Sequence, residues 1–276
     1  MTTPALLGAP VPAPAAQVAS PACDAGLTGH FDLFLGVSPP ATQGGRILVD
    51  VNDDFCEQFL TGKQIVPGNL NDFGGGPYLT DDPGWFMDPG QLLAQESLHF
   101  RALGRLRFWD IARGQWTTQV PNGEHVRLFG GVPLDVFLAS RDDPSLLLPY
   151  ESGTIFTVNG IQGPVEAGVD LADASGGIHT HLDFCLQDGT GDCAQRRFGT
   201  PAQGAYLIEL QFFSPAQAGG QRKYRDSPAV LVALANGLDT AQFQEALDAL
   251  SAPPRAQSTL QTRLPGAGVL LLSGQE

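Results

Sequence analysis

Positive charge is scarce in this chain of 276 residues, which has 15 lysine and arginine residues against 29 aspartate and glutamate residues. The resulting net charge of −14 argues against a nucleic-acid partner, because binding to phosphates requires a basic surface. Long apolar runs are also missing, since none approaches the roughly 18 residues that a membrane-spanning helix needs. What remains is an acidic chain, whose net charge favours cations near its surface and helps to keep the protein soluble.

Signatures of nucleophilic catalysis are missing as well. The sequence has no Gly-x-Ser-x-Gly elbow, and its four cysteines do not form a C-x-x-C zinc or redox motif. Cys185 and Cys193 flank the turn-rich run 187–192, so we predict a disulfide that closes this loop, with Cys23 and Cys56 as the second pair. Four free thiols are the alternative. Two disulfides would place the protein in an oxidising compartment, periplasmic or extracellular.

The chain is rich in residues that make turns, with 34 glycines and 22 prolines, and only 16% of its residues are charged. This composition is typical of many short strands joined by tight turns. Strand-like apolar runs follow one another at 31–37, 46–51, 98–108, 126–129, 136–139, 154–158, 178–184, 205–213 and 229–235. The pattern predicts an all-β fold, a single antiparallel, jelly-roll-like β-sandwich over residues 27–250.

The one good helical pattern covers 239–250, and Asp239 is placed to cap it. We expect the run at 205–213 to lie beside the histidine-bearing strand at 178–184, because strands joined by a loop of this kind usually pair antiparallel. Residues 1–26, rich in alanine and proline, are expected to form a flexible lead-in or the remnant of a signal peptide. The tail, 251–276, begins with a stretch rich in proline, serine and glutamine and is predicted to be disordered.

The most informative segment is 176–184, GGIHTHLDF, which holds two of the five histidines. Its apolar residues alternate with His179, His181 and Asp183, as in a strand with one buried face. Residues two apart on a strand share a face, with Cα atoms about 7 Å apart, so the two imidazoles can converge on one transition-metal ion. A solvent-facing strand that carries two histidines without a metal is the alternative.

Two further histidines are candidates to complete a metal site with this pair. His30 shares a strand face with Asp32, and His99 lies between two apolar residues in the run 98–108. We therefore expect both as additional ligands. Asp183 and Asp32 are expected to contact and orient the histidine rings rather than to bind the ion.

Aspartate-rich loops at 50–54 and 188–192 raise calcium as a weaker alternative, because hard cations bind clustered carboxylates. The first loop lacks the spacing of an EF-hand. Phe55 occupies the sixth position, where glycine is needed, and Thr61 occupies the twelfth, where glutamate is needed. Calcium therefore ranks behind the transition metals as a cofactor.

Seven short segments, spread from residue 29 to about residue 250, carry a resemblance to a known family. They are 29–32 (GHFD), 71–75 (NDFGG), 80–84 (TDDPG), 106–110 (LRFWD), 177–183 (GIHTHLD), 204–210 (GAYLIEL) and 226–230 (DSPAV). This ordered set resembles exported bacterial proteins described as Zur-repressed, many of which carry a PEP-type C-terminal sorting signal. The resemblance implies an envelope protein produced when zinc is scarce, and it favours His30, because a histidine stands at that point of the family's opening strand. The chain departs from the family in lacking a complete C-terminal anchor.

These observations predict an exported protein that holds one divalent transition metal for buffering or delivery. Zinc is favoured by the resemblance alone, and copper is its rival because an all-imidazole site prefers Cu²⁺ by affinity. The expected partners are the metal ion and an envelope or metal-uptake protein. Binding is favoured over catalysis, because neither an acid–base pair nor an open site can be argued from the sequence.

Two alternatives stay open. A cupin-like metal oxygenase also begins its metal site with His-x-His on a jelly-roll strand, and a glutamate should then follow four or five residues later. Cys185 and Leu186 occupy those positions here, and no Pro-x-Gly-x-x-His segment follows. A structural or adhesive surface protein without metal chemistry fits the acidic, glycine-rich, lysine-poor composition.

Overall fold

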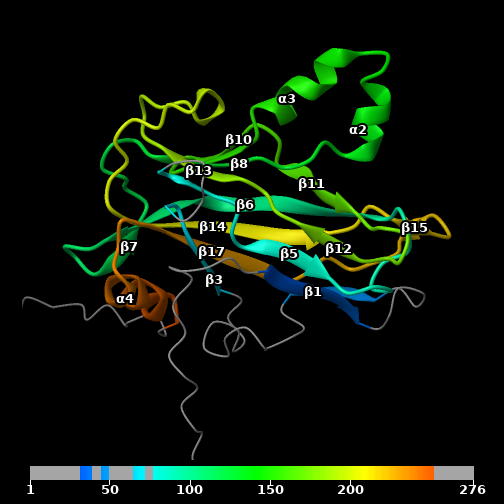
Figure 1. The fold of residues 1–276 in the computed structure, drawn as a ribbon, viewed down its shortest axis with the longest axis horizontal. Coiled ribbons are helices and arrows are strands. Elements are labelled where there is room, and N and C mark those ends of the chain that lie inside the picture. The colour runs from blue at the N-terminus through cyan, green and yellow to red at the C-terminus, as the bar shows by residue number, and fades with distance from the viewer. Residues whose placement is uncertain (1–31, 39–44, 50–64, 72–76, 252–276) are drawn as a thin grey trace, which may run out of the picture.

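The structure, a computed structural model, describes residues 32–38, 45–49, 65–71 and 77–251. In these residues, strands form three large sheets and one small hairpin, and short helices lie outside the sheets (Figure 1). The predicted all-β class is confirmed, and the curled sheets fit a sandwich-like arrangement. The predicted lead-in (1–26) and tail (251–276) lie outside the described residues, Ser251 excepted, so the domain bounds stay predictions.

The largest sheet of the described chain has six strands. In spatial order these are β11 (Glu166–Leu171), β6 (Ser97–Asp110), β14 (Gly204–Phe213), β17 (Ala229–Asn236) and β3 (Ile65–Asn69), and β7 (Gln115–Thr117) pairs with β6. Both faces of this sheet are covered, so β14 is an almost continuous apolar run. Tyr206 and Phe212 pack into the main core, whereas Leu207 packs on the other face with residues of α4 (Thr240–Ser251).

The other two large sheets in the described residues have five and four strands. The five-stranded sheet contains β10 (Gly160–Gln162), β9 (Thr154–Thr157), β8 (His125–Leu128), β13 (Phe184–Gln187) and β4 (Leu79–Thr80). The four-stranded sheet contains β12 (Ile178–Thr180), β5 (Gly84–Met87), β1 (Asp32–Ser38) and β2 (Arg46–Val49). The small hairpin of β15 (Gln217–Ala218) and β16 (Gln221–Arg222) follows β14.

One apolar cluster receives side chains from all three large sheets. Trp85 from the four-stranded sheet packs against Phe212 from the six-stranded sheet, with 4.8 Å between ring centroids. Phe156 and Phe184 from the five-stranded sheet are fully buried in the same cluster. Because burying one large apolar side chain contributes roughly 1.5–3 kcal/mol, this shared core holds the sheets together and gives the strands fixed relative positions.

The predicted C-terminal helix is confirmed, with α4 covering Thr240–Ser251. Its start is a reciprocal cap. The Asp239 carboxylate accepts from the backbone N–H of Gln242, and the Gln242 side chain accepts from the backbone N–H of Asp239. The apolar face of the helix, including Phe243 and Leu247, packs on the outer face of the six-stranded sheet.

The strand predicted at 136–139 is wrong, because these residues lie in the helix α2 (Leu134–Ala139). A four-residue apolar run does not distinguish strand from helix by its period. Here Pro133 precedes the first turn, Asp135 lies within it, and the Ser140 hydroxyl donates to the carbonyl of Phe137 at the end. The chain continues through a 3-10 turn, η2 (Pro144–Leu147), and α3 (Leu148–Glu151), at the top of Figure 1.

Two expectations about strand pairing are also wrong. β14 does not lie beside the histidine strand, since it pairs with β6 and β17. The histidine segment is instead divided between two sheets, because β12 pairs with β5 while β13 pairs with β8 and β4. The sheets are not wholly antiparallel either, since β1 with β5 and β17 with β3 pair in parallel.

Candidate metal centre

Three adjacent strands place an aspartate, a glycine and a histidine in one row across the four-stranded sheet. Asp32 on β1 pairs with Gly84 on β5. β12 pairs with the other side of β5, with Thr180 opposite Trp85, so the next residue, His181, lies beside Gly84. Figure 1 shows β12, β5 and β1 next to one another. The row therefore joins residues from distant parts of the chain.

The glycine in the middle of this row lets the two flanking side chains meet. A Cβ atom at Gly84 would clash with Oδ1 of Asp32 and with Cε1 of His181, and it would lie 2.6 Å from Nε2 of the same ring. Any larger residue on β5 would therefore push the carboxylate and the imidazole apart. The two side chains occupy the space that glycine leaves.

The side chains of Asp32, His179 and His181 bring their ligand atoms together. Oδ1 of Asp32 lies 3.2 Å from Nε2 of His181, and Oδ2 of Asp32 lies 3.3 Å from Nε2 of His179. The two imidazole rings are 5.6 Å apart between centroids. One ligand atom from each of the three residues lies within 4.8 Å of the other two. The carboxylate thus joins the histidine pair that the sequence singles out.

These three residues fit a transition-metal ion. Zinc binds imidazole nitrogen and carboxylate oxygen at about 2.0–2.1 Å, so two donors on a tetrahedral ion lie about 3.3 Å apart. Each histidine lies at about that distance from one carboxylate oxygen of Asp32, His181 from Oδ1 and His179 from Oδ2. Oδ1 of Asp32 is also buried without a hydrogen-bond partner, which is costly for a carboxylate oxygen and which a bound cation would relieve.

A backbone carbonyl orients the ring of His181. Nδ1 of His181 lies 2.9 Å from the carbonyl oxygen of Asp81, so the neutral ring donates its proton there. With Nδ1 as the donor, Nε2 is the ring nitrogen that faces Asp32 and that would bind a metal there. Oδ1 of Asp82 lies 3.8 Å from the same Nδ1, and the carboxylates of Asp81 and Asp82 form a second acidic cluster with this ring.

The candidate centre lies at the surface, and its members differ in exposure. The side chain of His179 is 56% exposed, whereas those of His181 and Asp32 are 20% and 21% exposed. His179 is on β12, at the edge of the four-stranded sheet in the described residues. Its ring packs edge-on against Phe86, with 5.6 Å between centroids, and Phe86 in turn contacts Phe34. An aromatic pair therefore supports the exposed histidine from one side.

The structure does not bring His99 into the centre, although the sequence proposes it as a ligand. His99 lies on β6, is 5% exposed, and lines a cleft between β6 and α2. Its Nε2 lies 2.8 Å from the hydroxyl of Ser97, and its ring packs against Phe213. Burial lowers the pKa of His99, against the opposing effects of Asp135 and Glu166. His99 is therefore a buried residue of the six-stranded sheet and belongs to neither acidic–histidine cluster.

Asp183 and Asp32 differ in their relation to the histidines. Regular strand pairing ends at Thr180, and Asp183, which follows in the segment before β13, is exposed and belongs to neither cluster. Partial desolvation and the nearby Asp81 carboxylate raise the pKa of Asp183. Asp32, in contrast, contacts both rings directly. Asp32 therefore contacts the histidine rings, as the sequence predicts, and one of its oxygens is also close enough to both rings to be a candidate ligand atom.

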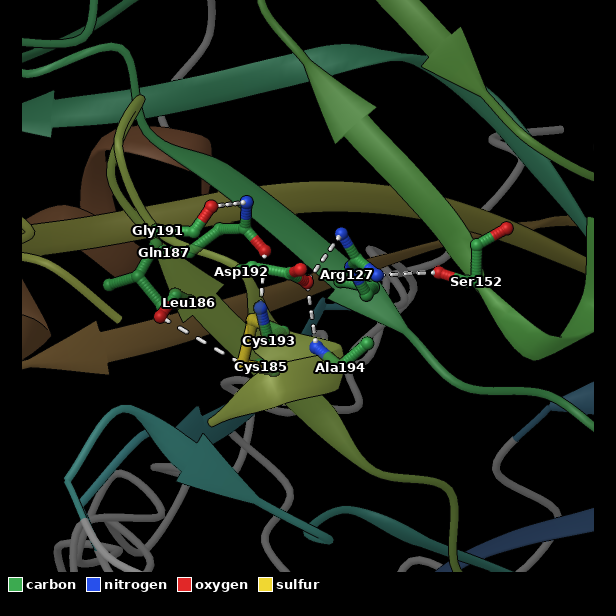
Figure 2. The surroundings of a disulfide bond; sticks show 9 residues. All are labelled: Arg127, Ser152, Cys185, Leu186, Gln187, Gly191, Asp192, Cys193 and Ala194. Carbon is green, nitrogen blue, oxygen red and sulfur yellow. Dashed lines mark hydrogen bonds and ion pairs between the residues drawn. A yellow bond between two sulfur atoms is a disulfide. The ribbon is translucent and has the colours of Figure 1, made fainter. Parts of the chain in front are cut away.

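The predicted disulfide between Cys185 and Cys193 is present, and Figure 2 shows its surroundings. Cys185 lies on β13 in the five-stranded sheet, so the bridge holds the loop after β13 and does not clamp β12. The Asp192 carboxylate caps the 3-10 turn η3 (Cys193–Gln195), and the side-chain oxygen of Gln187 accepts from the backbone N–H of Cys193. The loop is thus fixed by a covalent bond and by side-chain hydrogen bonds.

In the aspartate-rich loop at 188–192, the carboxylate of Asp188 is engaged in hydrogen bonds within the protein. Asp188 accepts hydrogen bonds from the backbone N–H groups of Thr190 and Thr200, and the two hydroxyls add to these. These bonds lower the pKa of Asp188 to about 2. A carboxylate satisfied in this way offers little to calcium, and no ligand cluster forms in this loop among the residues that the structure describes. The other aspartate-rich loop, 50–54, lies outside them.

No protein-family model, curated protein or solved structure matches this chain. In the described residues, no helix is long and apolar enough to cross a membrane. His30, predicted as a ligand, and Cys23 and Cys56, predicted as a second disulfide, fall outside the described residues. Those three assignments stay predictions.

Proposed function

We propose that this protein binds one divalent transition-metal ion through His179, His181 and Asp32, and that it buffers or delivers this ion as an exported protein. The observation that carries the proposal is the approach of both Nε2 atoms to the Asp32 carboxylate, at 3.2 and 3.3 Å, over a glycine that leaves room for it. Two supporting observations are the buried Oδ1 atom without a hydrogen bond and the carbonyl that orients His181.

The donor set favours zinc, with copper as its rival. Two imidazole nitrogens and a carboxylate oxygen are common ligands of Zn²⁺, and imidazole also suits Cu²⁺, which most sites bind more tightly. The resemblance to zinc-regulated envelope proteins favours zinc over copper. A role in buffering or delivery follows from the surface position of the centre, because an ion held beside a 56% exposed histidine can exchange with solution or with a partner protein.

Export is supported by the disulfide between Cys185 and Cys193, because such bonds persist in oxidising compartments. The proposed location is the periplasm or the cell exterior. An envelope or metal-uptake protein is the partner that this location suggests.

The test is a titration of Zn²⁺ and Cu²⁺ into full-length protein purified without a histidine tag. Calorimetry or competition with a chromophoric chelator would follow the wild type, His179→Ala, His181→Ala and a matched control, His125→Ala. We expect one ion per chain, and at least a tenfold loss of affinity in each of the first two variants, since even residues that only support a ligand contribute 10–100-fold. His125 belongs to neither cluster, so its removal should leave the affinity unchanged.

Wild-type affinity in both histidine variants would refute the site. Failure of the wild type to bind either ion would favour a structural or adhesive surface protein. In that case the contacts between Asp32 and the two histidines would be ion pairs of protonated imidazole.

A metal-dependent oxygenase is the second candidate, and one observation favours it. Two histidines and one carboxylate with open positions are the ligand set of non-haem iron(II) oxygenases. Oxygen consumption by protein reconstituted with Fe²⁺, measured against candidate small organic substrates, separates this enzyme from a metal carrier. Iron that binds without such turnover would leave the carrier as the better account.

A further inference from the structure

We propose that the cleft between β6, β11 and α2 binds a small organic ammonium ion with an apolar body, such as an arylalkylamine in its protonated form. The cleft is separate from the candidate metal centre, because the residues that line it do not include Asp32, His179 or His181. This inference goes beyond the proposed function and does not depend on it, so each can fail without the other.

Backbone hydrogen bonds fix the segment before α2 on β11, an edge strand of the six-stranded sheet in the described residues. Gly131 in this segment and Gly168 on β11 exchange two N–H···O hydrogen bonds, both of 2.7 Å. The cleft beside them has two parts, of about 300 and 610 Å³, which both border on Ser97, His99 and Pro133. These volumes fall within the range of sites for small molecules, so the cleft can hold a ligand of that size.

The smaller part of the cleft is largely apolar. Val132 and Phe137 line it from α2 and the segment before it, and Val169 and Leu171 line it from β11. Phe137 and Leu171 remain 49% and 44% exposed, which is a large exposure for apolar residues beside a cleft. The apolar body of a ligand would cover part of this surface and remove it from water, which favours binding.

Acidic residues outnumber basic ones along the cleft. One lining residue, Arg222, carries a guanidinium group. Four lining residues carry a carboxylate, namely Glu96, Asp135, Glu166 and Asp170. Arg101, Lys223 and Asp226 form ion pairs with lining residues, and with these three included five carboxylates lie beside three cations. An excess of negative charge in a cleft concentrates cations there.

This charge affects two titratable residues of the cleft. Burial lowers the pKa of His99, while Asp135 and Glu166 oppose this effect and Arg222 adds to it. Burial also raises the pKa of Tyr150, and the same two carboxylates add to the rise. His99 is therefore neutral at pH 7 and does not repel a cation, whereas the two carboxylates stabilise positive charge in the cleft.

These features determine how the ligand would lie. Its apolar body would lie in the smaller part, against Phe137 and Leu171. Its ammonium group would lie in the larger part, where Asp135 and Glu166 can accept hydrogen bonds and the ring of Tyr150 can add a cation–π contact. An anion of the same shape would be repelled by the carboxylates, and a neutral alcohol would lack the charge that they attract.

The test compares four ligands on the full-length protein. They are 2-phenylethylammonium, the neutral 2-phenylethanol, the anion 3-phenylpropanoate, and ethylammonium, which lacks the ring. Dissociation constants come from NMR titrations at low salt with EDTA, so that no metal ion binds the amine. We expect saturable binding of 2-phenylethylammonium and about tenfold weaker binding of each of the other three. Added salt should weaken the binding of the ammonium ion and leave that of the alcohol unchanged.

Two exposed lining residues and a matched control locate the binding site. Asp135→Asn should weaken the binding of 2-phenylethylammonium about threefold, the effect of one exposed ion pair, and should leave that of 2-phenylethanol unchanged. Phe137→Ala should weaken the binding of both ligands about threefold. Asp142→Asn is the control, because Asp142 is exposed in the turn after α2 and does not line the cleft. Circular dichroism establishes that each variant is folded.

Four outcomes would overturn the proposal. The first is the lack of saturable binding of 2-phenylethylammonium. Equal affinities for this ion and the alcohol would refute the selection of a cation, and equal affinities for the ions with and without the ring would refute the role of the apolar part. Folded Asp135→Asn and Phe137→Ala proteins that both bind like the Asp142→Asn control would show that the ligand binds elsewhere. None of these outcomes bears on the metal centre, because EDTA keeps metal ions out of the titration.

Discussion

Oδ1 of Asp32 and Nε2 of His181 lie 3.2 Å apart across Gly84, yet Oδ1 accepts no hydrogen bond. A buried carboxylate oxygen that accepts no hydrogen bond normally raises the free energy of the folded state. The position of Oδ1 therefore fits a ligand atom for a cation that the two neighbouring histidines would also bind. This contact can be tested by changing the carboxylate of Asp32 and by changing Gly84 between the two side chains.

The variant Asp32→Asn should lower the affinity for Zn²⁺ at least tenfold. The amide has nearly the shape of the carboxylate, but its neutral oxygen is a weaker ligand, so the change removes charge with little loss of packing. Competition with a chromophoric zinc chelator measures the effect. Asp183→Asn serves as the control and should change the affinity less than threefold. Equal affinities for the two variants would show that Asp32 is not a ligand.

The variant Gly84→Ala should also weaken zinc binding at least tenfold, because the added Cβ atom would collide with Asp32 and His181. Gly131→Ala is the matched control, since the nearest atom to its Cβ would lie 3.4 Å away, an ordinary contact. Circular dichroism would establish that both variants remain folded before zinc is titrated. A folded Gly84→Ala protein that binds zinc like the wild type would contradict the proposed packing of the centre.

Replacement of Cys185 and Cys193 by alanine should lower the free energy of unfolding by about 2–3 kcal/mol, the value expected for closing a loop with a sequence separation of 8. Alanine is preferred to serine because both positions are buried. Urea denaturation measures the loss, and peptide mapping without reductant identifies the bridge in the wild type. Zinc affinity should remain unchanged, since the bridge lies on β13 and the histidines lie on or next to β12. A loss of zinc affinity would mean that the loop and the centre are coupled.

The stability that Asp188 contributes should depend on pH in the acid range. Hydrogen bonds lower its pKa from 3.8 to about 2 in the folded protein, so the carboxylate stabilises the fold above about pH 4. This contribution should fall as the pH drops from about 4 to 2. Asp188→Asn should therefore cost on the order of 2 kcal/mol at pH 5, and the difference from wild type should shrink towards pH 2.

Urea denaturation at several pH values gives this dependence. The exposed Asp142, replaced by asparagine, is the control and should show no comparable change. A constant difference between Asp188→Asn and wild type from pH 5 to pH 2 would show that the ionised carboxylate is not the cause.

The sequence predicts those parts of the fold that depend on local pattern. The alternation around His179 correctly places a strand at Ile178–Thr180 and brings the two histidines together, although the predicted strand over 178–184 is divided into β12 and β13. Asp239 gives the correct start of α4. The turn-rich loop between Cys185 and Cys193 gives the disulfide. Each of these features depends on residues that are close together in the sequence. Backbone geometry and side-chain spacing are therefore sufficient to predict it.

The features that the sequence does not predict depend on contacts between segments that are distant in the chain. The position of Asp32 beside the two histidines requires the parallel pairing of β1 with β5 and the antiparallel pairing of β5 with β12, and neither pairing leaves a local signal in the sequence. Gly84 ends the segment 80–84 (TDDPG), whose aspartates, proline and glycine predict only a turn. His99 is misleading for a related reason. Alternation predicts that it faces away from its apolar neighbours, but β6 is covered on both faces, so this second face is also buried.

Asp32 is far in sequence from the two histidines, and this distance has a consequence for folding. No short fragment contains all three side chains, so the centre forms only when β1, β5 and β12 have come together in the complete domain. An ion that binds this native arrangement and not the unfolded chain stabilises it by mass action, by about 2.7 kcal/mol at a hundredfold excess over the dissociation constant. The concentration of free metal would then set how long the folded protein survives proteolysis, and molecules without metal would be degraded first.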